Sequence, residues 1–258
     1  MHASWFQKPI YSIAMIIAFI SLLACAVLAF ITPLYLYCMI LFLLFWLVFF
    51  IAASFTIHSG VYIKTICNGP DESRKIAITF DDGPDKNTPL ILDILEKNGV
   101  KASFFLIGEK VERNKSVVLK MVNAKNTVGN HSCDHKSNFP MMGVKKIKEN
   151  IAAAQELIKQ ATGTYPVYFR PPFGVTNPLI ARALKSFNLK VIGWSVRSLD
   201  TVNTDPEQVF ARIIKRLEPG SIILLHDTSN SVIPVLNELL LYCSRQNIIP
   251  VSLDELLK

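Results

Sequence analysis

Charged residues are missing from a long stretch near the N-terminus. From Pro9 to Ile63 the sequence has no Asp, Glu, Lys or Arg, although 18% of the 258-residue chain is charged. A membrane-spanning helix needs about 20 apolar residues, so this stretch is long enough for two. A cleaved signal peptide would need an apolar region of only about 7–15 residues. Thr32-Pro33 favours a hairpin, because proline disfavours helix at the residue before it. We therefore expect transmembrane helices over about 10–31 and 34–55.

Cysteines are also few, and no nucleic-acid-binding motif is present. The five cysteines lack metal-finger spacing, and an odd, sparse set argues against a disulfide scaffold. The net charge is +7, and because Lys8 and Lys64 are the only charged residues before position 65, the remainder carries +5. The lysines are scattered, which argues against a nucleic-acid partner. The basic excess suits either an anionic membrane surface or an ordinary solvated face.

Strand-like and helix-like segments alternate from Lys75 to the C-terminus, about seven times. Such alternation predicts parallel strands joined by helical crossovers. A complete eight-unit barrel usually needs about 250 residues, so we predict an α/β fold that is a distorted, incomplete (β/α) barrel over 75–258. A connector over 57–74 joins it to the hairpin region 1–56. We expect a connector strand at 61–66, a strand at 190–196 and a single helix over 110–125.

The first polar cluster follows a buried strand. Lys75 to Phe80 is apolar and rich in β-branched residues, and Asp81-Asp82-Gly83-Pro84 comes directly after it. Successive side chains of a strand point to opposite faces, so the two carboxylates diverge unless Gly83-Pro84 bends the chain. The carboxyl end of a parallel strand is where α/β folds place their chemistry. The cluster is therefore either a site or a solvated acidic turn.

Two histidines form the second cluster. His131 and His135 are four residues apart just after a predicted strand, and the chain has only five histidines. They would face one metal if the segment were helical. With one carboxylate of the acidic pair they give the two-histidine, one-carboxylate set of catalytic zinc sites. Such a zinc ion lowers the pKa of bound water towards about 7.

Two further clusters follow predicted strands. Arg170 begins Arg-Pro-Pro-Phe-Gly, and it could pair with the carboxylate that does not bind metal. The two prolines stiffen this loop and leave the N–H groups of Phe173 and Gly174 free to face a ligand. His226 ends an aliphatic strand, a position that suits a general acid in a partly apolar pocket. The alternatives are a structural turn for the loop and a sheet-capping role for the histidine.

Taken together, the four clusters resemble the motifs of one family, the polysaccharide deacetylases (NodB-homology, carbohydrate esterase family four). The resemblance covers about Lys75 to Lys258. It implies a distorted β/α barrel with a divalent metal, usually zinc, at its C-terminal face. The motifs that carry it are Thr79-Phe-Asp-Asp-Gly-Pro84, His131-Ser-Cys-Asp-His135, Arg170-Pro-Pro-Phe-Gly174 and Leu224-Leu-His226.

The resemblance also implies roles for single residues. Asp81 would be the general base, and Arg170 would orient it. The metal ligands would be Asp82, His131 and His135.

The same resemblance implies how the acyl group is held. The backbone N–H of Phe173 would help to stabilise the oxyanion. Leu224 would line the pocket for the acyl methyl group. His226 would protonate the leaving amine.

One motif departs from the family pattern. The stretch from Trp194 to Thr201 corresponds to a family motif Asp-x-x-Asp-Trp, and we count Trp194 and Asp200 among the candidate pocket residues. Asp200 matches the second Asp, whereas Arg197 stands where a tuning Asp would be and Thr201 replaces Trp. A neighbouring cation lowers the pKa of a histidine, so we expect Arg197 to depress that of His226.

These features predict a membrane-anchored, metal-dependent N-deacetylase of N-acetylglucosamine units in a cell-wall or surface glycan. One alternative is a deacetylase or deformylase of a lipid-linked amino sugar, and another is a non-catalytic glycan-binding membrane protein. The partners would be the glycan or lipid-linked sugar and the lipid around the hairpin. Lys8, Lys64, Arg74 and Lys75 flank the hairpin and favour a cytoplasmic domain. Peptidoglycan lies outside, so the side of the membrane stays open.

Overall fold

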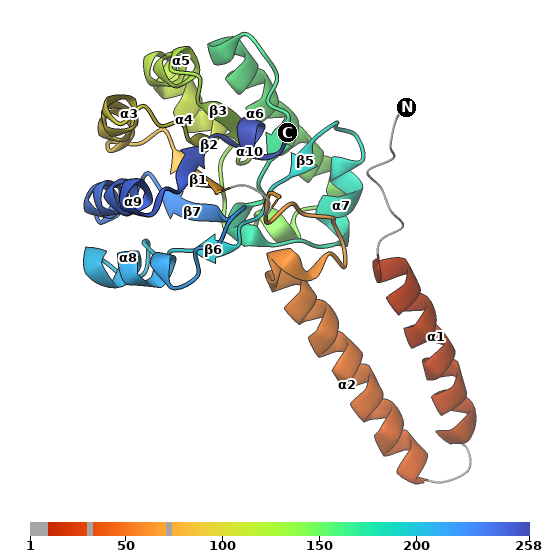
Figure 1. Cartoon of the computed structure of the whole chain (residues 1–258). Helices are drawn as coiled ribbons and strands as arrows, with labels where there is room; N and C mark the ends of the chain where they lie inside the picture. The colour runs from red at the N-terminus through yellow and green to blue at the C-terminus, as the bar shows by residue number, and fades with distance from the viewer. Residues whose placement is uncertain (1–9, 30–32, 71–73) are drawn as a thin grey trace.

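Two long helices form the N-terminal part of the protein. The structure is a computed structural model that describes residues 10–29, 33–70 and 74–258. Helices α1 (Ile10–Ala29) and α2 (Pro33–Phe55) run side by side in opposite directions and extend away from the domain, which the end of α2 contacts (Figure 1). At 1.5 Å per residue they are about 30 and 35 Å long.

Only one helix among the described residues is long and apolar enough to cross a membrane, namely α2 over Tyr35–Phe55. Within α1 the apolar stretch Ile13–Ala24 is shorter. Residues 30 and 31, where the first predicted span ends, lie outside the described residues. The two-helix membrane hairpin therefore stays a prediction.

The rest of the chain curls around one parallel sheet. Its order is β5-β4-β3-β2-β1-β7-β6, and β8 pairs with the start of β1. Every strand pair is parallel, and among the described residues the end strands β5 and β6 do not pair with each other. The predicted incomplete barrel is thus confirmed. The strands are β1 (Lys75–Gly83), β2 (Ser103–Leu106), β3 (Thr127–Asn130), β4 (Tyr168–Phe169), β5 (Lys190–Val191), β6 (Val196–Arg197), β7 (Ile222–His226) and β8 (Ile249–Val251).

Helices cover the outside of this sheet (Figure 1). The largest apolar cluster lies between helices and strands, where the fully buried rings of Phe80 and Phe104 stack 5.1 Å apart. The helices are α3 (Thr88–Lys97), α4 (Gly108–Arg113), α5 (Lys115–Asn123), α6 (Val144–Thr162), α7 (Pro178–Leu184), α8 (Pro206–Ile214), α9 (Val232–Gln246) and α10 (Leu253–Leu256), and the 3₁₀ turns are η1 (Ile57–Ser59), η2 (Phe139–Met141) and η3 (Pro172–Gly174).

Two predicted elements are divided. The single helix expected over 110–125 is split into α4 and α5, because Asn114 has non-helical angles (φ −131°, ψ 38°). The strand expected over 190–196 is interrupted between β5 and β6. There the carbonyls of Ile192 and Gly193 accept hydrogen bonds from Arg170, so they are turned away from a sheet ladder.

The predicted connector is part of the barrel wall. The expected strand at 61–66 is reduced to a bridge at Ile66, whose N–H donates to Val191 O (2.8 Å) and whose carbonyl accepts from Gly193 N (2.8 Å). The Gly69 N–H then donates to Gly220 O (2.8 Å). Ile57 is buried in the interior cluster that also holds Trp194 and Leu224. The connector thus fills the seam beside β5.

Candidate active site

The two acidic residues lie at the carboxyl end of β1, and a bulge places both on the rim. The pairing of β1 with β2 shifts register between Phe80 and Gly83, and Asp82 has a left-handed φ of +70°. The bend therefore falls at Asp82, one residue earlier than predicted. As a result both carboxylates face His131, whose Nε2 lies 3.7 Å from Asp81 Oδ2 and 3.5 Å from Asp82 Oδ1.

Arg170 holds one of these carboxylates. Its side chain is fully buried, and Nη1 lies 2.6 Å from Asp81 Oδ1. The other guanidinium bonds go to Thr79 Oγ1 (2.8 Å), Gly193 O (2.8 Å) and Ile192 O (3.3 Å). Because every guanidinium nitrogen donates at least one hydrogen bond, the buried ion pair has a fixed geometry. The predicted pairing of Arg170 with Asp81 is present. The other oxygen of this carboxylate, Oδ2, faces His131 and the rest of the site.

Asp82, His131 and His135 form a compact donor cluster. One donor atom from each residue lies within 4.8 Å of the others, and both histidine Nε2 atoms are 3.5 Å from Asp82 Oδ1. Two ligands about 2.0 Å from a tetrahedral zinc ion are about 3.3 Å apart, close to this spacing. Asp82 Oδ1 is buried and has no hydrogen-bond partner. An orphaned buried carboxylate oxygen between two imidazoles fits a cation site.

The residues of the cluster shift one another's pKa values. The carbonyl of Arg170 can only accept, so His131 Nδ1, 2.8 Å away, carries a proton, and Nε2 faces the carboxylates. Burial, reinforced by the charge of His131, lowers the pKa of His135 to about 4. Burial opposes ionisation of Asp82, but the imidazoles of His131 and His135, each with Nε2 3.5 Å from its Oδ1, hold its pKa well below the usual range. Burial alone would lower the pKa of His131, but Asp81 and Asp82 raise it above its ordinary value, so a divalent ion would bind Nε2 in competition with a proton.

The histidines do not lie on a helix, so the helical arrangement considered from their spacing is wrong. Ser132 and His135 have left-handed φ values of 71° and 48°. Side chains fix this loop instead. Asn130 Oδ1 accepts from Ser132 N (2.8 Å), and Ser132 Oγ accepts from His135 N (3.1 Å). Asn150 Oδ1 also accepts from Cys133 N (2.7 Å).

His226 is tuned by Asp200, which corrects our expectation for Arg197. His226 Nδ1 donates to Asp200 Oδ1 (2.8 Å), and its backbone N–H donates to Asp200 Oδ2 (2.8 Å). Burial alone would lower the pKa of His226, but the hydrogen bond and charge of Asp200, with Asp81 and Asp82, raise it above its ordinary value. The predicted depression is therefore wrong. Arg197 is exposed, with its guanidinium 5.9 Å from the ring of Trp194.

Thr201, the other departure from the family pattern, is exposed in the loop after Asp200.

The loop after β4 brings an aromatic ring to the candidate metal-ligand cluster. Phe173 has φ +61° and is half-exposed, with its ring 4.6 Å from that of His135. The role of the Phe173 N–H as an oxyanion donor stays a prediction. The N–H of Gly174 is not free, because it donates to Pro171 O (3.0 Å). A Cβ on Gly174 would lie 2.3 Å from Trp194 Cη2, so Trp194 supports this loop. Leu224 is buried beside Trp194 in the same cluster.

Two polar residues near the site escaped the sequence analysis. Thr79 Oγ1 accepts from Arg170 and donates to Ile223 O (2.6 Å), and its position two residues before Asp81, on the same face of β1, was an available sign. Asp227 is fully buried under Gly83, where a Cβ would lie 2.5 Å from its Oδ2, and Thr88 Oγ1 donates to it. Burial raises the pKa of Asp227 to about 7. No sequence pattern indicated this burial.

Comparisons with known proteins agree with this geometry. The family model for polysaccharide deacetylase matches residues 68–192. A peptidoglycan-N-acetylglucosamine deacetylase of Bacillus cereus is 31% identical over 197 residues, which is 73% of this chain and 91% of the relative. Another of the same name and organism is 32% identical over 162 residues, 62% of this chain. The chain spans 58% of that second relative.

Solved structures share the fold. The Bc1960 peptidoglycan N-acetylglucosamine deacetylase has a TM-score of 0.70 and 28% identity, covering 74% of this chain and 91% of the other. Wild-type BA3943, a CE4 family pseudoenzyme from Bacillus anthracis, has a TM-score of 0.70 and 27% identity. The match covers 76% of this chain and 69% of the other. The chain belongs to the polysaccharide deacetylase (NodB-homology) family, carbohydrate esterase family four.

Proposed function

We propose that this protein is a membrane-anchored, metal-dependent N-deacetylase that acts on N-acetylglucosamine-type units of a cell-wall glycan. One observation carries the proposal: a held carboxylate, an open metal-ligand cluster and a carboxylate-tuned histidine meet on one rim of the sheet. They come from the carboxyl ends of β1, β3, β4 and β7. The names of the Bacillus cereus relatives support the substrate class.

Asp81 acts as the general base in this proposal. Arg170 occupies its Oδ1, which leaves Oδ2 to accept a proton from the attacking water. Asp82, His131 and His135 would hold the divalent ion, and zinc suits this donor set. The ion would act as a Lewis acid that polarises the acyl oxygen and makes water a better nucleophile.

His226 completes the reaction as the general acid. Attack on the acyl carbon forms a C–O bond, and the Phe173 N–H donates to the developing oxyanion. The C–N bond then breaks as His226 gives its proton to the departing nitrogen, so that acetate and a free amino sugar leave. Leu224 and Trp194 would wall the space for the acyl methyl group.

Membrane anchoring is supported by α2, whose apolar stretch Tyr35–Phe55 is almost entirely left uncovered by the rest of the protein. We propose that α1 and α2 both span the bilayer. A substrate in the cell wall requires the catalytic domain to face outward.

A lipid-linked amino sugar is the second candidate substrate. The observation in its favour is a hydrogen bond between the Thr176 N–H, in the loop after η3, and Ser54 O (2.9 Å) in the last turn of α2. This contact holds the active-site loop next to the end of the candidate membrane helix.

The test is acetate release by the detergent-solubilised full chain from peptidoglycan and from a lipid-linked N-acetyl sugar. We expect zinc to support release and a chelator to stop it. Release from peptidoglycan supports the wall-modifying function, whereas release from the lipid-linked sugar alone transfers the proposal to that substrate. No release from either by the zinc-loaded protein would favour a non-catalytic role like that of the pseudoenzyme relative.

A further inference from the structure

The last turns of α2 are packed into the catalytic domain instead of serving as a free tether. Ala53 is buried with Val61 and Tyr62, and the Tyr62 hydroxyl donates to Phe50 O (2.9 Å). Ser54 O accepts from the Thr176 N–H. The domain therefore sits directly on one end of α2 (Figure 1).

This contact places the active site near the end of the helix. Phe173 precedes Thr176 by three residues, and three residues of extended chain span at most about 11 Å. The ring of Phe173 in turn lies 4.6 Å from that of His135. The metal-ligand cluster is thus within a short distance of the last turn of α2.

Large apolar side chains are exposed around the same point. Phe55 is 73% exposed, Phe173 51% and Met141 78%. Met141 belongs to this neighbourhood because the side chain of Asn177, the residue after Thr176, donates to Pro140 O (2.6 Å). Single exposed apolar residues are ordinary, but a group beside a candidate membrane span indicates an interaction surface.

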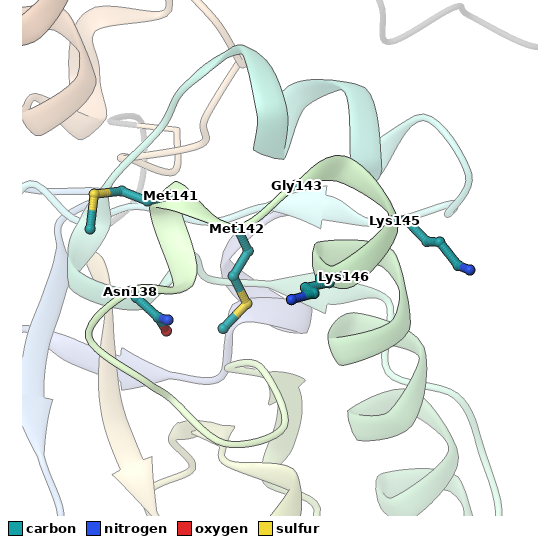
Figure 2. A pocket seen from close by; sticks show the side chains of 6 residues that line it. All are labelled: Asn138, Met141, Met142, Gly143, Lys145 and Lys146. Carbon is teal, nitrogen blue, oxygen red and sulfur yellow. The ribbon is translucent and has the colours of Figure 1, made fainter.

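Basic residues adjoin this apolar group. Met141 lines a hollow of about 630 Å³ together with Asn138, Met142, Gly143, Lys145 and Lys146. In Figure 2 Met142 and Lys146 point into the hollow, whereas Met141 and Lys145 point outward. The first turn of α6 has no acidic residue, and Lys145 Nζ approaches Glu149 only to 3.9 Å. Apolar side chains flanked by lysines are typical of surfaces that lie in the headgroup region of anionic membranes.

We propose that Phe55, Met141 and Phe173, flanked by Lys145 and Lys146, form a surface that rests on a bilayer containing anionic lipid. We call it the bilayer surface of the domain. The inference rests on the proposed anchoring by α2 and deepens the proposed function: the site opens at the membrane, so its substrate is an amino-sugar glycan held close to the bilayer.

The first test uses the full chain in vesicles of phosphatidylcholine with phosphatidylglycerol. A photo-cross-linking amino acid replaces Met141, and in the matched control it replaces Leu119, which is 50% exposed on α5. We expect lipid cross-links from position 141 at least fivefold above those from 119. Equal, low yields at the two positions would overturn the proposal.

The second test compares the double variant Lys145→Glu/Lys146→Glu with the control Lys115→Glu on α5. Each basic side chain near an anionic surface contributes a few-fold, so we expect the double variant to deacetylate a vesicle-tethered N-acetyl sugar about 5- to 30-fold more slowly. Its activity on a soluble N-acetylglucosamine oligomer should be unchanged. Equal losses on both substrates, or none on either, would refute the bilayer surface.

The two proposals fail in different ways. If no form of the protein deacetylates any substrate, the proposed function is wrong, while the cross-linking experiment still decides the bilayer surface. If the protein is active but position 141 gives no lipid adduct, the proposed function is supported and the proposed bilayer surface is wrong.

Discussion

Removing the charge of Asp200 should move the alkaline limb of the pH–activity profile. In Asp200→Asn the amide oxygen can still accept from His226 Nδ1, so the variant loses the charge and the hydrogen bond from the His226 backbone N–H but keeps the one to the ring. An opposite charge at hydrogen-bond distance shifts a pKa by about 1–3 units. The Asp200 oxygen lies 2.8 Å from Nδ1, within that range of influence.

The sign follows from the role of His226. Asp200 raises its pKa, and the general acid must be protonated, so activity is lost as pH rises through that pKa. In Asp200→Asn the alkaline limb of kcat/KM should fall by about 1–3 pH units, which reduces activity above the limb about 10- to 1000-fold. Asp81 and Asp82 still act on the histidine and limit the shift.

The assay is acetate release from a soluble N-acetylglucosamine oligomer between pH 5 and 10, with zinc content and circular dichroism checked for each variant. Arg197→Gln is the matched control, because an exposed guanidinium is screened by solvent and should move the limb by less than about 0.3 units. An unmoved limb in Asp200→Asn, together with an upward shift in Arg197→Gln, would show that Arg197 tunes the acid and that our reasoning is wrong.

Three other predictions concern the same rim. Asp81→Asn should reduce kcat by about 10²–10⁴-fold yet leave zinc affinity by calorimetric titration unchanged, because a base is lost and no ligand; retained activity would remove Asp81 from the role of base. Arg170→Met should lower the free energy of unfolding in urea by about 3–5 kcal/mol, since Asp81 is left buried and unpaired; a loss below 1 kcal/mol would contradict this account. Asp227 has a pKa raised to about 7, so the folded state binds more protons than the unfolded state and stability falls as pH rises from about 4 to above 7. Asp227→Asn should flatten that slope in urea unfolding at pH 5 and 8, and an unchanged slope would assign it to other groups.

Strand periodicity was enough to predict the parallel, incomplete barrel and to place four polar clusters at strand ends. It could not predict that β1 bulges at Asp82, because a left-handed aspartate leaves no mark in a pattern of apolar and polar residues. The loop shape of 131–135 was hidden for the same reason. Its geometry depends on Asn130 and on Asn150, which belongs to a separate element, the helix α6.

The tuning of His226 shows the limit of reasoning by motif. Position within the motif pointed to Arg197, but the chain turns so that Asp200 reaches both the ring and the backbone of His226. Leu199, with φ +60°, takes part in that turn. This turn of the chain depends on the backbone angles of one residue, which the neighbouring sequence does not determine.

The seam beside β5 limits how freely the anchor can be exchanged. Ile66 bridges β5, and Ile57 packs against Gly193, whose carbonyl is one of the two that hold Arg170. The chain before Lys75 therefore helps to position Asp81, the proposed base, through Arg170. A fusion that joins a foreign membrane helix directly to β1 would remove the connector, which is part of the barrel wall, together with the anchor. A workable fusion boundary lies inside α2, upstream of Phe49, so that the lipid-facing part can be replaced while its final turns stay with the domain they support.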